Sequence, residues 1–329
     1  MVFALRLAVG LLLLAGIFTM KAELGETLRR IAGARPGWLA AAFAVLVAGQ
    51  LTSVWKWGWM LRVAGRGASA AMLVRASLVG LFYNNFLPGS VGGDVVKLLM
   101  VAPEVGGRAR AAASVFMQRN TGVAGLLVIG LPLSLLHPVS VALFPAWLGA
   151  LNHMATWFAL ATAGYVAVNA AMLSRRAYRK LWAFLGGRGG GSALLHKLGS
   201  GARSLHESLL LFRSSLAGAV AISVLTQFLD CVIVWFIAHA MGLELSIWFC
   251  CVCVPMVTLA QLLPVTVNGL GLRESLYLVL LGSVGVPAEA ATGLSLISFG
   301  LGFVLSLIGG LVHAAGPARR RAGSGPAAH

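Results

Sequence analysis

The sequence is poor in charge and poorest in acidic residues. Only 10% of its 329 residues are charged, and Asp and Glu together number nine. A soluble domain carries roughly a quarter charged residues, so the composition argues against a soluble enzyme or a nucleic-acid-binding domain. The hydrophobic share is 59% and the mean hydropathy is +0.90. These values predict an all-α, polytopic membrane protein.

Cysteine is also scarce. The four cysteines all fall in apolar segments, where free Cys packs as a small hydrophobe, so we expect neither disulfides nor metal ligands. No paired nucleophile and base is visible in the sequence, and no ligand set for a cofactor. We therefore expect a protein without a cofactor that is not an enzyme.

Six apolar segments are long enough to cross a bilayer. They are residues 2–20, 38–61, 111–136, a stretch within 139–173, 216–241 and 288–313. Residues 21–35 between the first two read as a polar connector in the interface. The tryptophan-rich residues 55–59 are typical of the headgroup boundary, where an indole keeps its polar edge hydrated.

A break interrupts the apolar pattern at residues 87–93. The run before it, 68–87, has helix length, but the run after it, 91–101, covers only about 17 Å of a hydrocarbon core about 30 Å thick. We therefore expect a re-entrant helical hairpin that Pro103 ends. Non-helical chain at membrane depth needs partners in protein or in a water-lined cavity, so this break is a candidate site.

A second break repeats this pattern. Residues 247–263, 264–271 and 272–285 again form an apolar run, a Pro/Gly break and a short run. The breaks share Leu, Pro, a hydroxyl residue, Val and Gly at matching offsets, with Pro88 and Pro264 176 residues apart. Counting spans places the two hairpins on opposite faces, as in the inverted repeats of transporters.

The chain divides into four regions. Residues 1–173 form a membrane half with the first hairpin at about 68–102, and 216–313 form the other half with the second hairpin at about 247–285. Between them, 174–215 is a basic connector with amphipathic helices, and 314–329 is a basic tail. The positive-inside rule places the connector, the tail and both termini in the cytoplasm. Against this topology, four cations fall outside: Lys21, Arg29, Arg30 and Arg35.

Three motifs carry a resemblance to a known family. They are NFLPGSVGGD at residues 85–94, QRNTG at 118–122, and LP at 263–264 with NGLGLRE at 268–274. Over nearly its whole length the chain resembles the lysylphosphatidylglycerol synthase transmembrane family, or flippase-like membrane proteins. The resemblance implies movement of a lipid between leaflets. No soluble aminoacyl-transfer domain follows the last span, so aminoacylation is not expected; stand-alone relatives are linked to polyprenyl-lipid, glycolipid and hopanoid pathways.

The residues at the breaks suit an anionic headgroup. Glycines allow backbone N–H groups to approach a phosphate, and each returning helix points its positive dipole end inward. Lys97 and Arg273 lie near those ends, and Arg119 lies about 12 Å into its span. We expect the acids Asp94, Asp230 and Glu274 to neutralise these cations when the site is empty, or to carry protons. The predicted substrate-binding residues are Asn85, Pro88, Ser90, Gly92, Gly93, Asp94, Lys97, Arg119, Asp230, Pro264, Asn268, Gly269, Gly271, Arg273 and Glu274.

Simpler roles stay open for several of these residues. Asp94 can be an N-cap, Arg273 and Glu274 can be an interfacial pair, and Arg119 and Asp230 can form structural salt bridges. The sequence favours a flippase-like transporter of an anionic lipid in the inner membrane. The alternatives are an ion-coupled transporter of a small anion and a non-catalytic membrane partner of a lipid-modifying enzyme. The expected partners are membrane lipids and not nucleic acid, with an enzyme partner and an oligomer left open.

Overall fold

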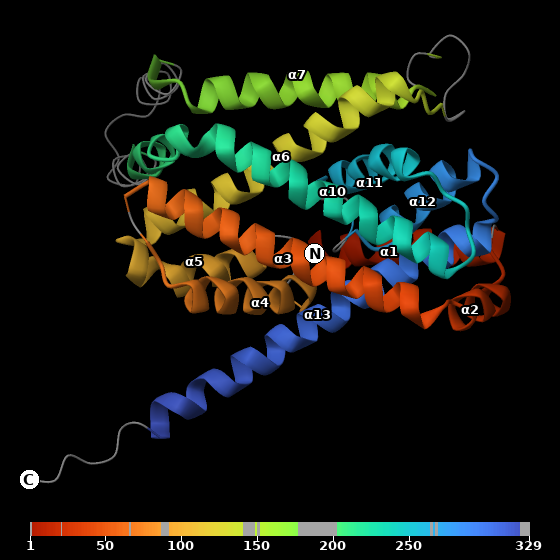
Figure 1. Ribbon diagram of the computed structural model, residues 1–329, viewed down its shortest axis with the longest axis horizontal. Coiled ribbons are helices and arrows are strands. Elements are labelled where there is room, and N and C mark those ends of the chain that lie inside the picture. Colours follow the sequence, from red (N-terminus) through yellow and green to blue (C-terminus); the bar gives the residue numbers. More distant parts are fainter. Residues whose placement is uncertain are drawn as a thin grey trace, which may run out of the picture.

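The computed structural model describes residues 2–20, 22–65, 67–86, 92–140, 149, 152–176, 203–263, 266 and 269–322, with side chains from residue 8 to 315 except 20 and 86. This part of the chain is all-α and contains no β-strand (Figure 1). Its helices are α1 (Val2–Met20), α2 (Leu24–Ala32), α3 (Pro36–Val63), α4 (Ala70–Phe86), α5 (Gly92–Val105), α6 (Arg108–Leu136), α7 (Met154–Met172), η2 (Arg213–Ser215), α10 (Leu216–Ala240), α11 (Ile247–Gln261), α12 (Leu272–Gly282) and α13 (Ala288–Ala322).

Five helices of the described part are long and apolar enough to span a membrane. They are α3, α6, α7, a continuous segment Arg203–Ala240 that includes α10, and most of α13. A sixth span results if α1 and α2, which meet at a bend of 91°, count as one. Four predicted spans coincide with α3, α6, α7 and α13, and the fifth, 216–241, coincides with α10 but begins 13 residues after the start of its helical segment. The first predicted span, 2–20, corresponds to α1, which counts as a span only together with α2. Of the predicted connector, residues 177–202 lie outside the described residues, as do 141–148 of the fourth predicted segment.

Helices α3 and α10 form an antiparallel pair along the molecule. The Arg35 N–H donates to the Ala240 carbonyl (2.9 Å), and the Lys56 ammonium donates to the Ser223 hydroxyl (2.8 Å) further along. Because α6 is likewise antiparallel to α3, and α7 to α6, two ends of the molecule can be defined. The Val63 end holds the end of α3 and the starts of α6 and α10. The Pro36 end holds the start of α3 and the end of α10.

Two helical hairpins fill opposite halves of this frame (Figure 1). The first hairpin, α4 and α5, follows α3 and precedes α6, so it begins and ends at the Val63 end. The second hairpin, α11 and α12, follows α10 and precedes α13, at the Pro36 end. With 14 and 11 residues, α5 and α12 rise only about 21 Å and 17 Å, which is too short to span.

Two sequence expectations about local structure are wrong. Pro103 does not end its helix: α5 continues to Val105, although proline lacks the backbone N–H that a helix would use at this position. The tryptophan cluster does not lie as a whole at the headgroup boundary. Trp55 is exposed, but Lys56 and Trp57 are 3% and 0% exposed, because α6 and α10 cover that face of α3. The Trp57 indole N–H donates to the Ser114 hydroxyl of α6 (3.1 Å).

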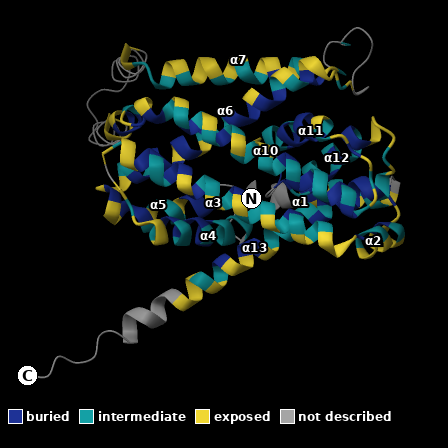
Figure 2. Ribbon diagram, in the orientation of Figure 1, coloured by how far each residue is buried: buried dark blue, intermediate teal, exposed yellow. Residues whose placement is uncertain are grey.

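The described residues form two buried apolar clusters, one in each half. The cluster at the Val63 end includes Trp57, Met60 and Phe212. The cluster at the Pro36 end includes Cys231, Cys250, Cys251 and Cys253, which are buried and free, as predicted for packing residues. Helix α7 lies at the periphery and is largely exposed, as are residues 311–315 of α13 (Figure 2).

Candidate anion-binding site at the first hairpin

Helices α4 and α5 approach each other closely because two glycines face one another. A Cβ at Gly93 would lie 2.0 Å from the Gly80 carbonyl oxygen, and one at Gly80 would lie 2.8 Å from Lys97 side-chain carbons. The Asn84 side chain accepts the Gly93 N–H (2.8 Å), which satisfies one of the open donors at the start of α5. The break itself, residues 87–91, lies outside the described residues.

Asp94 stands in the first turn of α5 and pairs with two cations. One Asp94 oxygen contacts the Arg119 guanidinium of α6, and the other lies 4.0 Å from the Lys97 ammonium one turn along α5. The capping role considered for Asp94 is not what the carboxylate does here; Asn84 supplies the cap. Asp94 therefore balances charge between α5 and α6.

A third cation at this place was missed by the sequence reasoning. Lys56 of α3 is 3% exposed, and its ammonium donates to the Gln118 carbonyl (3.1 Å) and to the Ser223 hydroxyl (2.8 Å). Its charge also interacts with that of Lys97. The sequence did contain a signal for Lys56, because an ionisable residue inside an apolar span is rare and usually functional. The tryptophans on either side of Lys56 favoured a position at the membrane interface instead.

Lys56, Asp94, Lys97 and Arg119 form the first charge cluster, contributed by α3, α5 and α6. With these side chains ionised, three positive charges meet one negative charge. Asp94 and Lys97 are 11% and 12% exposed at their side chains, whereas Arg119 is 41% exposed. A cation that lacks a counter-charge at membrane depth costs about 3 kcal/mol, so this cluster favours an added anion. Arg119 is the member that an anion can reach.

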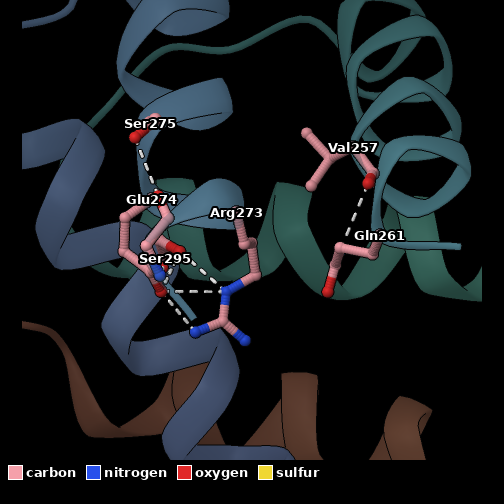
Figure 3. Close-up of polar contacts among 7 residues, drawn as sticks. Val257, Gln261, Arg273, Glu274, Ser275 and Ser295 are labelled. Carbon is pink, nitrogen blue, oxygen red and sulfur yellow. Dashed lines mark hydrogen bonds and ion pairs between the residues drawn. The ribbon is translucent and has the colours of Figure 1, made fainter. Parts of the chain in front are cut away.

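The second hairpin carries a different arrangement, the second charge cluster of Arg273, Glu274 and Ser295. Glu274 is fully buried; one of its oxygens accepts the Gly271 N–H (2.7 Å) and the other contacts Arg273 and the Ser295 hydroxyl (3.2 Å). The Arg273 guanidinium also donates to Ser295 (3.0 Å) and lies 4.9 Å from the Phe299 ring centre. Figure 3 shows the Arg273 side chain turned toward Glu274 and Ser295.

The start of α12 requires glycine for two reasons, the backbone conformation and the lack of room for a side chain. Gly271 has φ +77°, and a Cβ there would lie 2.4 Å from the Gly10 carbonyl oxygen of α1. Gly269 has φ +75° and faces the Gln261 side chain. These glycines close the second break against α1 and α11, and the Glu274 carboxylate occupies the Gly271 N–H. The described contacts of both glycines are packing contacts, and their predicted contact with phosphate stays a prediction.

The other predicted site residues are dispersed. Asn85 donates to the Ser306 hydroxyl of α13 (2.8 Å), and Gly92 begins α5. Asp230 lies on α10, and no described residue forms a hydrogen bond or an ion pair with its carboxylate. Four predicted site residues lie outside the described residues: Pro88, Ser90, Pro264 and Asn268.

Comparison with known proteins agrees with this architecture. Residues 1–310 match the sequence model of one protein family, described as the lysylphosphatidylglycerol synthase TM region. No protein of curated function and no solved structure matches the chain. The match covers every helix of the two hairpins and both charge clusters.

Proposed function

The chain belongs to the family of lysylphosphatidylglycerol synthase TM regions, and on that premise we propose that it binds the phosphate of an anionic lipid at the first charge cluster and moves that lipid between leaflets. The observation that carries the proposal is the surplus of two positive charges among Lys56, Asp94, Lys97 and Arg119. These side chains come from three separate helices, so the surplus is held by tertiary packing and is not an accident of one helix face.

The geometry of Arg119 suits a phosphate ligand. Its guanidinium already pairs with a carboxylate, and the same fork can hold phosphate oxygens through two hydrogen bonds. Asp94 keeps Lys97 as a partner when a phosphate takes up Arg119. The apolar surroundings favour a ligand with acyl chains, since Phe116 and Val128 of the same helix are exposed large hydrophobic residues.

The opposed hairpins support movement of the headgroup across the bilayer. One short helix pair starts from each end of the α3–α10 frame. Each pair extends through only part of the bilayer, so a headgroup at either break has a shorter distance to cross. We take this as an inverted arrangement with two re-entrant hairpins, in which rocking of one half against the other exposes the first charge cluster alternately.

The proposed orientation puts the Val63 end in the cytoplasm of an inner-membrane protein, with both termini there. The described arginines near this end are Arg62, Arg75, Arg108, Arg110, Arg175, Arg176, Arg203 and Arg213. The Pro36 end has Arg29, Arg30 and Arg35, and acids accompany them: Glu23, Glu26, Glu244 and Glu289. The positive-inside rule counts cations, and the larger number at the Val63 end supports this orientation.

Leaflet exchange in reconstituted vesicles tests the proposal. Purified protein is placed in phosphatidylcholine vesicles containing a fluorescent phosphatidylglycerol, or a fluorescent phosphatidylcholine as the zwitterionic control, and outer-leaflet dye is reduced chemically. We expect the protein to expose most of the anionic probe to the reductant and to act more slowly on the zwitterionic one. No exchange of the anionic probe, or equal exchange of both, contradicts the proposed selectivity.

A further inference from the structure

Asp230 is an acid in the middle of a membrane helix that neither charge cluster uses. It lies fourteen residues after the start of α10, a helix of 25 residues, which places it about 21 Å along the helix axis. The Asp230 carboxylate has no hydrogen-bond or ion-pair partner in the described part of the chain. A bare negative charge at this depth costs free energy unless a proton or a cation accompanies it.

The other acids differ from Asp230 in partner or position. Asp94 and Glu274 hold cations in the two charge clusters. The remaining six lie near helix ends: Glu26 and Glu207 form ion pairs, Glu104 and Glu289 accept main-chain N–H groups, and Glu23 and Glu244 are exposed. Among the described acids, Asp230 therefore differs in two respects: it lies in the middle of a span, and no protein group pairs with its carboxylate.

In the part of the chain that the structure describes, the elements packed around α10 place no cation in contact with Asp230. On α3, Lys56 is bound to Gln118 and Ser223, and Arg62 lies in the last turn; on α6, Arg119 is bound to Asp94, and Arg108 and Arg110 lie in the first turn. Helix α11 contributes the thiols Cys250 and Cys251, and Cys231 follows Asp230 on α10 itself. Helix α13 has no charged residue between positions 290 and 312, and the arginine of η2, Arg213, lies 17 residues earlier.

A stripe of polar side chains connects Asp230 with the first charge cluster. Ser223, Gln227 and Asp230 follow one another at spacings of four and three, so they share one face of α10. Ser223 holds the Lys56 ammonium, and Gln227 reaches the Gly122 carbonyl of α6 (3.5 Å). Two helical turns, about 10 Å, separate Ser223 from Asp230. The two sites are thus close enough for their charges to interact through a poorly screening interior.

We propose that Asp230 is a proton-binding site coupled to the anion site. The proton bonds to a carboxylate oxygen of Asp230 when an anion occupies the first charge cluster, because the anion removes the positive surplus that otherwise favours the carboxylate. When the anion leaves, the O–H bond breaks and the proton passes to water. Binding linkage is reciprocal, so protonation of Asp230 strengthens anion binding, by on the order of tenfold.

The proposal deepens the proposed function, and a spectroscopic test separates the two. Infrared difference spectra of the purified protein saturated with phosphatidylglycerol, between neutral and alkaline buffer, report the carbonyl stretch of a protonated carboxylic acid without any transport. We expect this band in the wild type and in Glu207→Gln, a control at an exposed ion-paired acid, and no band in Asp230→Asn. A wild type without the band, or Asp230→Asn with it, overturns the proposal.

Two further measurements complete the test. If Asp230→Asn folds poorly, Asp230→Glu replaces it, and a shift in the frequency of the band assigns it to position 230; an unshifted band counts against the assignment. In vesicles with the fluorescent phosphatidylglycerol, an imposed pH gradient is expected to change the exchange rate several-fold in the wild type but not in Asp230→Asn. If the exchange rate of the wild type does not change with the pH gradient, the proposed coupling is overturned. If lipid exchange is absent but the infrared band of Asp230 is present, only the proposed lipid transport is refuted.

Discussion

The two hairpins contain breaks of similar sequence but differ in their balance of charge. At the first hairpin, Lys97 and Arg119 pair with the single acid Asp94, Lys56 adds a third positive charge near Lys97, and Arg119 is 41% exposed. At the second hairpin, Arg273 is matched by Glu274, which is fully buried and also caps α12. The first hairpin thus carries a surplus of positive charge, on which the proposed anion site rests, while the second hairpin pairs its charges in a buried contact.

The largest effect is expected from Glu274→Gln. The substitution leaves the Arg273 guanidinium without its counter-charge in a buried position, and breaking a buried pair costs about 3–5 kcal/mol. We expect a fall in the thermal unfolding temperature of detergent-solubilised protein, with or without added lipid. If Glu274→Gln unfolds like the wild type but loses anionic lipid, the second charge cluster is a binding site and the comparison is reversed.

Arg119→Ala is the matching change in the first charge cluster. Hydrogen bonds to charged groups contribute about 1.5–3 kcal/mol, so retention of anionic lipid should fall about 10- to 100-fold. The folded state should be less affected, because Asp94 retains Lys97. Arg203→Ala, at an exposed pair with Glu207, is the control. Lipid binding is measured by fluorescence of a labelled phosphatidylglycerol, and an equal loss in both variants would count against a specific site.

Gly93→Ala tests whether the close contact of α4 and α5 builds the first charge cluster. A methyl group there collides with the Gly80 carbonyl, and overpacking typically costs about 1–3 kcal/mol. We expect lower thermal stability together with weaker binding of phosphatidylglycerol, since Asp94 and Lys97 move with α5. Gly282→Ala in α12, where a Cβ meets nothing within 4 Å, should change neither. An unaffected Gly93→Ala variant contradicts the described helix contact.

Asp94→Asn gives the smallest effect and the opposite sign. It removes the one acid of the first charge cluster, so the positive surplus rises and Asp94 no longer competes with phosphate for the Arg119 guanidinium. We expect binding of the labelled phosphatidylglycerol to tighten several-fold and leaflet exchange to slow. Weaker binding in Asp94→Asn would mean that the carboxylate orients Arg119 for the ligand and does not compete with it.

The sequence predicted the helices well and the charge arrangement only in part. Long apolar runs gave α1, α3, α6, α10 and α13, because lipid requires every backbone group to be bonded within a helix. The sequence predicted Asp94 as an acidic partner of the nearby cations, but not its pairing with Arg119 in particular, since the two are 25 positions apart on different helices. Lys56 was read as interfacial because its burial depends on α6 and α10, which cover it only in the folded chain.

The balance of the second charge cluster could not be predicted for a similar reason. The order Arg273-Glu274 was compatible with an exposed pair or a ligand site, and only the packing of α13 brings Ser295 and Phe299 to the guanidinium. Hydropathy locates the break, but the side chains that surround it come from distant segments. Whether a charged pair stays accessible to a ligand or is enclosed by other helices therefore depends on the tertiary structure.

Native mass spectrometry of the purified protein with its co-purifying lipids tests the central claim most directly. The wild type should retain one class of anionic, phosphate-bearing lipid. The lipid should be lost in Arg119→Ala and kept in Arg273→Lys, which preserves the charge of the second charge cluster. Retention of the lipid by Arg119→Ala, or its loss from Arg273→Lys alone, would contradict the assignment of the anion site to the first hairpin.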